Sequence, residues 1–104
     1  MLIVTTNTIP GRDYEVLGMV QGSTIQTVNM FKDVGAGLKT LLGGELHGYN
    51  EMMMKARDLA SARMEEQART LGADAVICVR FATSAIMQSA AEVMAYGTAI
   101  RFRD

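Results

Sequence analysis

The sequence predicts an α+β domain in which a small antiparallel sheet packs on one long amphipathic helix. Apolar residues recur at helical spacing from about Leu46 to Leu71. Short β-branched runs precede this stretch, and two more follow it in the arrangement of a hairpin. Strands on both sides of a helical segment favour antiparallel pairing, with the helices on one side of the sheet.

The N-terminal part is expected to contain two strands and a shorter helix. Leu2 to Thr6 reads as a strand that ends in a turn at Pro10-Gly11, and Tyr14 to Gln21 reads as a second strand. Residues 23 to 44 are expected to form an irregular helix that ends at two glycines. The apolar residues at helical spacing in this segment are Val28, Met30, Phe31, Val34, Leu38, Leu41 and Leu42.

The long helix carries the strongest pattern in the sequence. Residues three or four apart share one face of a helix, so the spacing predicts a single buried stripe. The stripe consists of Tyr49, Met53, Ala56, Ala60, Met64, Ala68 and Leu71. The charged residues Glu51, Lys55, Asp58, Glu65, Glu66 and Arg69 fall on the opposite, solvated side. Gly72 is placed to close the helix in the left-handed conformation.

Two β-rich runs, Ala75 to Ala85 and Ala91 to Arg103, are expected to pair as a hairpin. A loop centred on Gln88 sets the register. One face then pairs Ile77 with Ala99, Val79 with Gly97, and Phe81 with Ala95. The other face pairs Cys78 with Thr98, Arg80 with Tyr96, and Ser84 with Glu92. This second face is too polar for a core and suits a subunit contact or a wet groove.

Size and composition point to one soluble domain, residues 1–104, that completes its burial by self-association. A chain of 104 residues fits a single core, and a domain of this size is often marginal without a disulfide, metal or partner subunit. The net charge of −1 argues against nucleic acid as a partner. No apolar run is long enough to cross a membrane. With no secretory leader and one cysteine, the expected location is the cytoplasm.

No catalytic motif is present in the sequence, and the metal-ligating pattern is limited to one position. His47 and Glu51 stand four residues apart at the head of the long helix, with Glu45 just upstream, so these side chains can face one ion. A weakly bound divalent metal is one interpretation. A solvated pair of polar side chains is the other, since two or three ligands rarely make a closed site.

Three further residues have side chains that call for an explanation. Cys78 lies among aliphatic residues and is expected to behave as a small buried hydrophobe. Arg57 adjoins the buried stripe, and Arg80 interrupts an apolar strand, so each is expected to need an acceptor. Structural pairing is favoured for both arginines, with ligand binding as the alternative.

Several blocks of residues resemble the YbjQ family of small bacterial proteins, a group without established activity that carries a heavy-metal-binding label. The resemblance covers nearly the whole chain. It implies a compact subunit that assembles into a ring, specifically a pentamer. Arg80-Phe81-Ala82 replaces a stretch that is often acidic in the family, which weakens any cation site built there. The matching residues are Gly22, Asn29, Asp33, Gly43-Gly44, Tyr49, Ala56-Arg57, Ala60, Leu71-Gly72-Ala73-Asp74-Ala75-Val76 and Gly97-Thr98-Ala99.

Two hypotheses of function follow. The first is a non-enzymatic oligomeric binding or scaffold protein, with a metal or small-ligand site at a subunit interface. The second is an enzyme whose site is assembled between subunits, and the more favoured answer is that the protein is not an enzyme. Tyr49, Arg57 and Arg80 are the candidate ligand-binding residues. In the enzyme hypothesis, these three residues and Glu45 together form the site between subunits.

Overall fold

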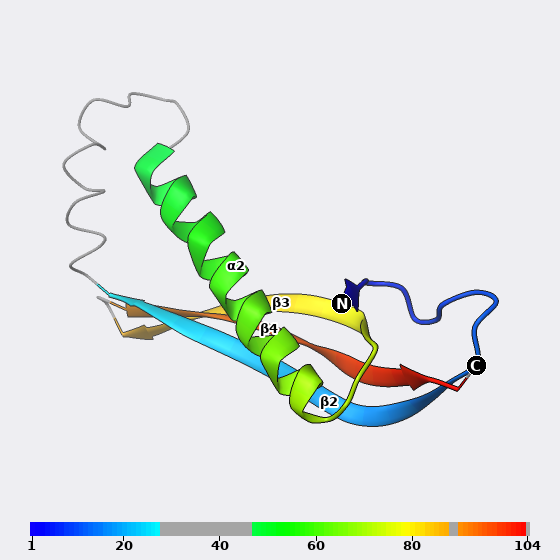
Figure 1. The fold of residues 1–104 in the computed structure, drawn as a ribbon. Helices are drawn as coiled ribbons and strands as arrows, with labels where there is room; N and C mark the ends of the chain where they lie inside the picture. Colours follow the sequence, from blue (N-terminus) through cyan, green and yellow to red (C-terminus); the bar gives the residue numbers. More distant parts are fainter. Residues whose placement is uncertain (28–46, 88–89, 104) are drawn as a thin grey trace.

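The computed structural model describes residues 1–27, 47–87 and 90–103. In this part of the chain one helix packs on a four-stranded sheet (Figure 1). The elements are β1 (Leu2–Ile3), β2 (Tyr14–Thr27), α2 (His47–Thr70), β3 (Ala75–Met87) and β4 (Ala90–Phe102). The predicted α+β class is confirmed. Within these ranges no helix is long and apolar enough to span a membrane.

The strand order in the sheet is β1-β3-β4-β2. The predicted hairpin of β3 and β4 is confirmed, β2 lies antiparallel to β4, and β1 lies parallel to β3. Thus β1 and β2 occupy opposite edges of the sheet.

The second strand is longer than predicted. It continues to Thr27, so the expectation of a helix starting at residue 23 is wrong for residues 23–27. Burial there alternates with a period of two, because Thr24 and Gln26 are buried while Ile25 is exposed, which is the signature of a strand. The rest of the predicted second helix lies outside the described residues.

The long helix follows its predicted pattern closely. Ala56, Ala60, Met64 and Ala68 are all buried against the sheet, and Met53 packs at the margin of the same core. Leu71 is 44% exposed, so its placement in the buried stripe is wrong. The reason is that α2 ends at Thr70, and Gly72 closes it with a φ of 78°. The amide of Ala73 then donates to the carbonyl of Ala68, as in a helix end capped by a left-handed glycine.

A β-bulge in β3 changes the predicted hairpin register at the start of that strand, up to Cys78. The pairs Phe81 with Ala95, Arg80 with Tyr96, and Ser84 with Glu92 are confirmed. Before the bulge, however, Ile77 pairs with Thr98 rather than Ala99, and Cys78 lies within the irregularity with a φ of 58°. The predicted pairs of Ile77 and Cys78 are therefore wrong, because the bulge leaves both Cys78 and Val79 opposite Gly97 and so adds one residue to β3.

Gly97 is the residue of β4 that accommodates this bulge. A Cβ placed on Gly97 would lie 2.8 Å from a methyl carbon of Val76, 2.9 Å from the carbonyl oxygen of Ile77 and 3.1 Å from a methyl carbon of Val79. Real Cβ atoms essentially never make contacts below 3.0 Å, so the first two distances exclude a side chain at position 97 unless its neighbours shift. The small residue at position 97 therefore allows the extra residue of β3 to bend across β4.

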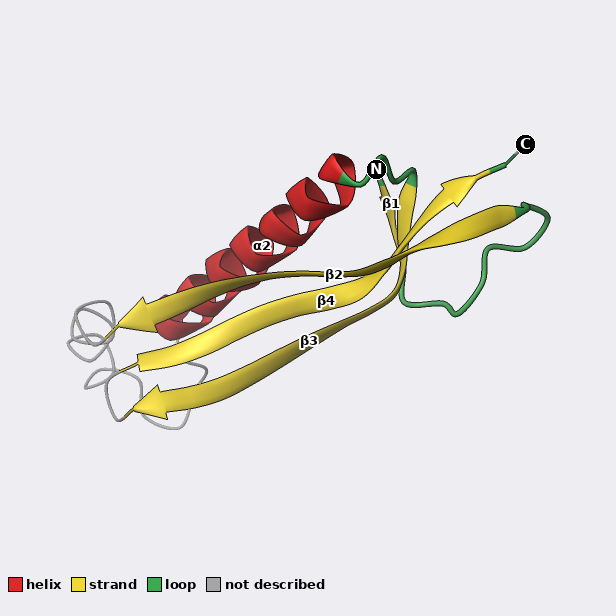
Figure 2. Ribbon diagram, turned by 90° about the horizontal axis from the view of Figure 1, so that it is seen from below, coloured by secondary structure: helices red, strands yellow, loops and turns green. Residues whose placement is uncertain are grey.

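The two faces of the sheet are covered unequally. The helix packs on one face, mainly over β2 and β4. On the other face, the segment between β1 and β2 covers only one end, where Ile9 packs with Ile77 and Ile100. Figure 2 views the sheet from this second side and shows the strands uncovered along most of their length. We refer to this surface as the helix-free face.

Candidate functional site

The N-terminal segment meets the β3 bulge and forms a hydrogen-bonded corner. The amide of Val79 donates to the carbonyl of Val4 over 3.1 Å, and the amide of Cys78 donates to the carbonyl of Thr6 over 3.0 Å. Two successive amides therefore point at the N-terminal segment, whereas in a regular strand successive amides point to opposite sides. The bulge thus fixes where the N-terminal segment leaves the sheet edge.

Arg80 ties the same corner together through its side chain. One guanidinium nitrogen donates to the carbonyl of Thr5 over 3.0 Å and to the carbonyl of Val79 over 2.9 Å. The sequence predicted that Arg80 needs hydrogen-bond acceptors, and two backbone carbonyls fill this role. This arrangement gives Arg80 a structural role in anchoring the N-terminal segment.

An apolar groove of about 460 Å³ opens beside this corner, on the helix side of the sheet. This volume lies in the range of roughly 300 to 1,000 Å³ that is typical of ligand pockets. None of its lining side chains is charged, and hydroxyl groups come from both the N-terminal segment and the helix. The lining residues are Ile3, Val4, Thr5, Thr6, Ser61, Val79 and Phe81.

The groove continues onto an unpaired strand edge. In the described part of the chain, β1 pairs with β3 as far as Val76. The residues that follow β1 then form hydrogen bonds with β3 as far as Val79. Beyond that point β3 runs on to Met87, and no strand within residues 1–27, 47–87 and 90–103 lies at its outer edge. Side chains 81–85 are all exposed there, and Phe81 is 48% exposed. This segment is the free edge of β3.

The opposite edge of the sheet is capped by the helix. The amide of Gln21 donates to the side-chain carbonyl of Gln67 over 2.7 Å, and Arg63 donates to the carbonyl of Ser23 over 2.6 Å. Both backbone groups lie on the outer side of β2, where they would otherwise pair with another strand. Capping of this kind protects an edge against strand addition. The free edge of β3 has no comparable caps among the described residues.

The predicted site residues do not form one cluster in the described structure. Arg57 and Glu51 are exposed on α2. Arg80 lies between Val79 and Phe81, which line the groove, so its side chain leaves from the other face. His47 and Tyr49 lie in the first turn of α2, but their side chains are outside the described part, as is all of Glu45. The predicted metal set therefore stays a prediction.

The described residues do not fit a metal centre. Within residues 1–27, 47–87 and 90–103, no three His, Cys, Asp or Glu side chains gather closely enough to hold an ion. Cys78 is half-buried and packs against the apolar cluster of Ala75, Ile77 and Ile100, so the expected buried position is reached only in part. Its Sγ lies 3.6 Å from Oδ1 of Asn7, an oxygen acceptor, rather than beside a second soft ligand.

Among the described residues, one helix lies on a twisted sheet with an apolar groove at one strand edge, which is a small α+β architecture. The family model described as "Putative heavy-metal-binding" matches residues 1–103. The chain belongs to this family, YbjQ, whose curated members carry the name UPF0145.

Relatives at high identity cover nearly the whole chain. A UPF0145 protein of Clostridium novyi is 57% identical over 101 residues, which is 97% of this chain and 98% of that protein. A UPF0145 protein of Thermus thermophilus is 53% identical over 102 residues, covering 97% of this chain and 90% of that one. The sequence similarity therefore extends over nearly the full length of both relatives.

A solved structure shares the fold. The crystal structure of a protein of unknown function from Pediococcus pentosaceus, assigned to the DUF74 family, superimposes with a TM-score of 0.73. It covers 98% of this chain and 97% of its own, at 20% sequence identity. At this identity the similarity establishes the fold alone.

Proposed function

We propose that the protein is a non-enzymatic, cytoplasmic binding protein that works as a homo-oligomeric scaffold. The observation that supports this most directly is the composition of the helix-free face. Val16, Met19 and Ile25 on β2 are 64%, 71% and 55% exposed. Large apolar side chains gathered on a bare sheet surface are typical of protein interaction sites.

The neighbouring strands extend this surface. Tyr96 of β4 stands between Gln21 of β2 and Arg80 of β3 in one row across the sheet. Aromatic and methionine side chains are enriched in interfaces, and the surrounding polar residues provide a rim. A second copy that packed here would bury the face that α2 leaves open.

The shape of the chain supports self-association as well. The radius of gyration is 17.0 Å, against about 13 Å for a compact domain of this length. An elongated chain buries less of its surface than a compact one, so an interface between copies would add the missing burial. The family resemblance favours a closed ring, a pentamer, as the form of this assembly.

Native mass spectrometry of protein purified without chelator tests the proposal, because it reports subunit number and bound ions together. We expect an oligomer that dissociates when Met19 and Ile25 are both replaced by glutamate. Met54→Glu is the matched control, since Met54 is 50% exposed on α2 and not on the helix-free face. A wild-type monomer at micromolar concentration would contradict the proposal, as would equal dissociation by the control.

A further inference from the structure

The free edge of β3 and the groove beside it form a surface that assembly through the helix-free face would leave open. The groove is lined by Val79, Phe81 and Ser61, which lie on the helix side of the sheet. Because side chains alternate along a strand, the helix-free face is formed by the other residues of β3, including Arg80 and Ala82. The two surfaces are thus distinct.

We propose that this groove binds an extended peptide segment of a partner protein by strand addition to β3. The proposal rests on the binding role proposed above and names the partner class. In strand addition, backbone hydrogen bonds supply much of the affinity, and pockets for alternate side chains supply the specificity.

The chain's own N-terminal segment shows that this edge accepts a strand. Leu2 and Ile3 pair in parallel with Ala75 and Val76, and Val4 continues the pairing through hydrogen bonds to Val76 and Val79. The same edge continues past Val79 without a partner strand in the described structure. A bound segment would therefore prolong the line of β1 along β3.

The geometry of β3 identifies the backbone groups that would bind. The amide of Val79 points outward, because it donates to the carbonyl of Val4. Amides and carbonyls alternate in direction along a strand, so those of Phe81, Thr83 and Ala85 point outward too. A peptide added here would place alternate side chains over Phe81 and into the apolar groove.

Arg57 supplies the charge preference of the partner. It lies four residues before Ser61, which lines the groove, and so on the same side of α2. It is exposed and has no hydrogen bond or ion pair within the described part of the chain. The fitting segment is therefore β-branched or apolar at alternate positions, with an acidic side chain in reach of the guanidinium, which favours carboxylates.

The direct test titrates a synthetic peptide, acetyl-Val-Thr-Val-Thr-Asp-Thr-amide, into the isotope-labelled full chain and follows the backbone amide resonances. We expect saturable shifts at Phe81, Thr83 and Ala85. A peptide with lysine in place of aspartate should bind at least about tenfold more weakly, since a charge-assisted hydrogen bond contributes on that order.

Two pairs of matched variants locate the site. Arg57→Glu should weaken binding by about tenfold, whereas Lys55→Glu makes the same charge change on another side of α2 and should leave binding unchanged. Phe81→Glu should abolish the shifts, while Ala82→Glu, on the helix-free face of the same strand, should retain them. Equal effects within either pair would overturn the site.

Two other results would also overturn the proposal. One is the absence of shifts at the β3 edge up to millimolar peptide. The other is hydrogen-exchange protection of the Thr83 and Ala85 amides that rises with protein concentration in the absence of peptide, because a second copy would then occupy the edge. The subunit number of the same samples separates the two claims: an oligomer that binds no peptide contradicts only this inference, and a monomer that binds peptide contradicts only self-association.

Discussion

Gly22 on β2 lies directly against the backbone of Ala60 on α2, with no space between them for a side chain. A Cβ placed on Gly22 would overlap the carbonyl oxygen of Ala60 and the amide of Met64, and it would lie 2.7 Å from the carbonyl carbon of Arg63. These are backbone atoms, which cannot move aside without shifting the helix. The pair therefore sets how closely α2 approaches the sheet.

Gly22→Ala is accordingly expected to destabilise the protein. Overpacking a tight contact typically costs about 1–3 kcal/mol, and a backbone clash lies at the upper end of that range. Chemical denaturation followed by circular dichroism measures the change. Ser23→Ala, one residue along the same strand, is the control and should be nearly neutral. An unchanged denaturation midpoint for Gly22→Ala would contradict the close approach.

Ala60→Asp tests the buried helix stripe. Ala60 is fully buried, so the substitution would place a carboxylate in the core, and we expect a loss of more than about 3 kcal/mol or complete unfolding. Ala62→Asp adds the same group at an exposed position of the same helix. Thermal unfolding of the two variants should differ clearly, and similar midpoints would mean that the stripe is assigned wrongly.

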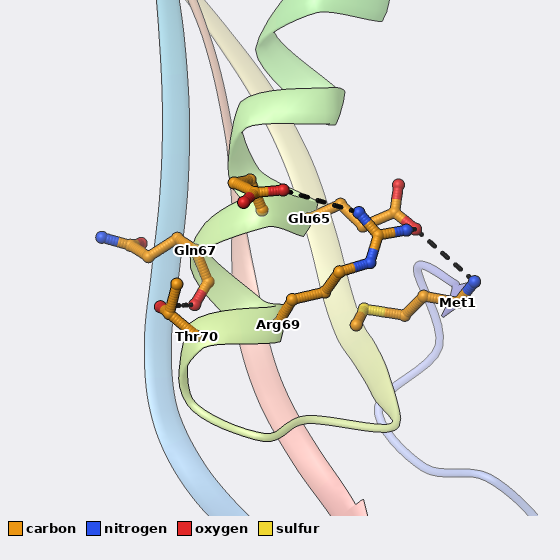
Figure 3. Close-up of polar contacts among 6 residues, drawn as sticks. Met1, Glu65, Gln67, Arg69 and Thr70 are labelled. Atoms are coloured by element: carbon orange, nitrogen blue, oxygen red, sulfur yellow. Dashed lines mark hydrogen bonds and ion pairs between the residues drawn. The ribbon is translucent and has the colours of Figure 1, made fainter.

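Glu65→Gln is expected to have a small effect. Glu65 accepts a hydrogen bond from Arg69 over 2.9 Å and lies 3.5 Å from the amino group of Met1, and Figure 3 shows that amine directed at the carboxylate. Arg69 is 56% exposed, so solvent screens the pair and its loss should cost about 0–1 kcal/mol. Urea denaturation at low and high salt measures this, and a loss well above that range would reveal a stronger link to β1.

The long helix could be predicted because its burial depends on local spacing. Met53, Ala56 and Ala60 follow one another at steps of three and four, which share one face of a helix, whereas a step of three would place strand residues on opposite faces. The end of the helix was equally local, since Gly72 adopts the left-handed conformation that its position suggested.

The β3 register could not be predicted because its cause is not local. Glycine and proline often mark a bulge in a sequence, but β3 contains neither of them near Cys78. It exists where the amides of Cys78 and Val79 turn to the N-terminal segment. The carbonyl of Thr5 that binds Arg80 lies 75 residues away in sequence. The groove arises from the same long-range contacts, so none of its lining residues was among the predicted site residues. Of the predicted residues, Arg80 lies at the adjoining corner, with its side chain on the other face.

The last prediction concerns zinc. We expect any divalent metal to bind weakly and to depend on His47 rather than Cys78. His47 and Glu51 stand one helical turn apart, with Glu45 close in sequence. Among the described residues, the polar contact of the Cys78 thiol is with an oxygen of Asn7 and not with a second soft ligand. Because imidazole binds metal only when it is neutral, the affinity for metal should fall below about pH 6.5.

Calorimetric titration of zinc into wild type, His47→Ala and Cys78→Ala measures this. Tight binding abolished only by Cys78→Ala would contradict the assignment and point to a thiolate site shared between subunits, whereas no binding by wild type would leave the protein a scaffold without metal.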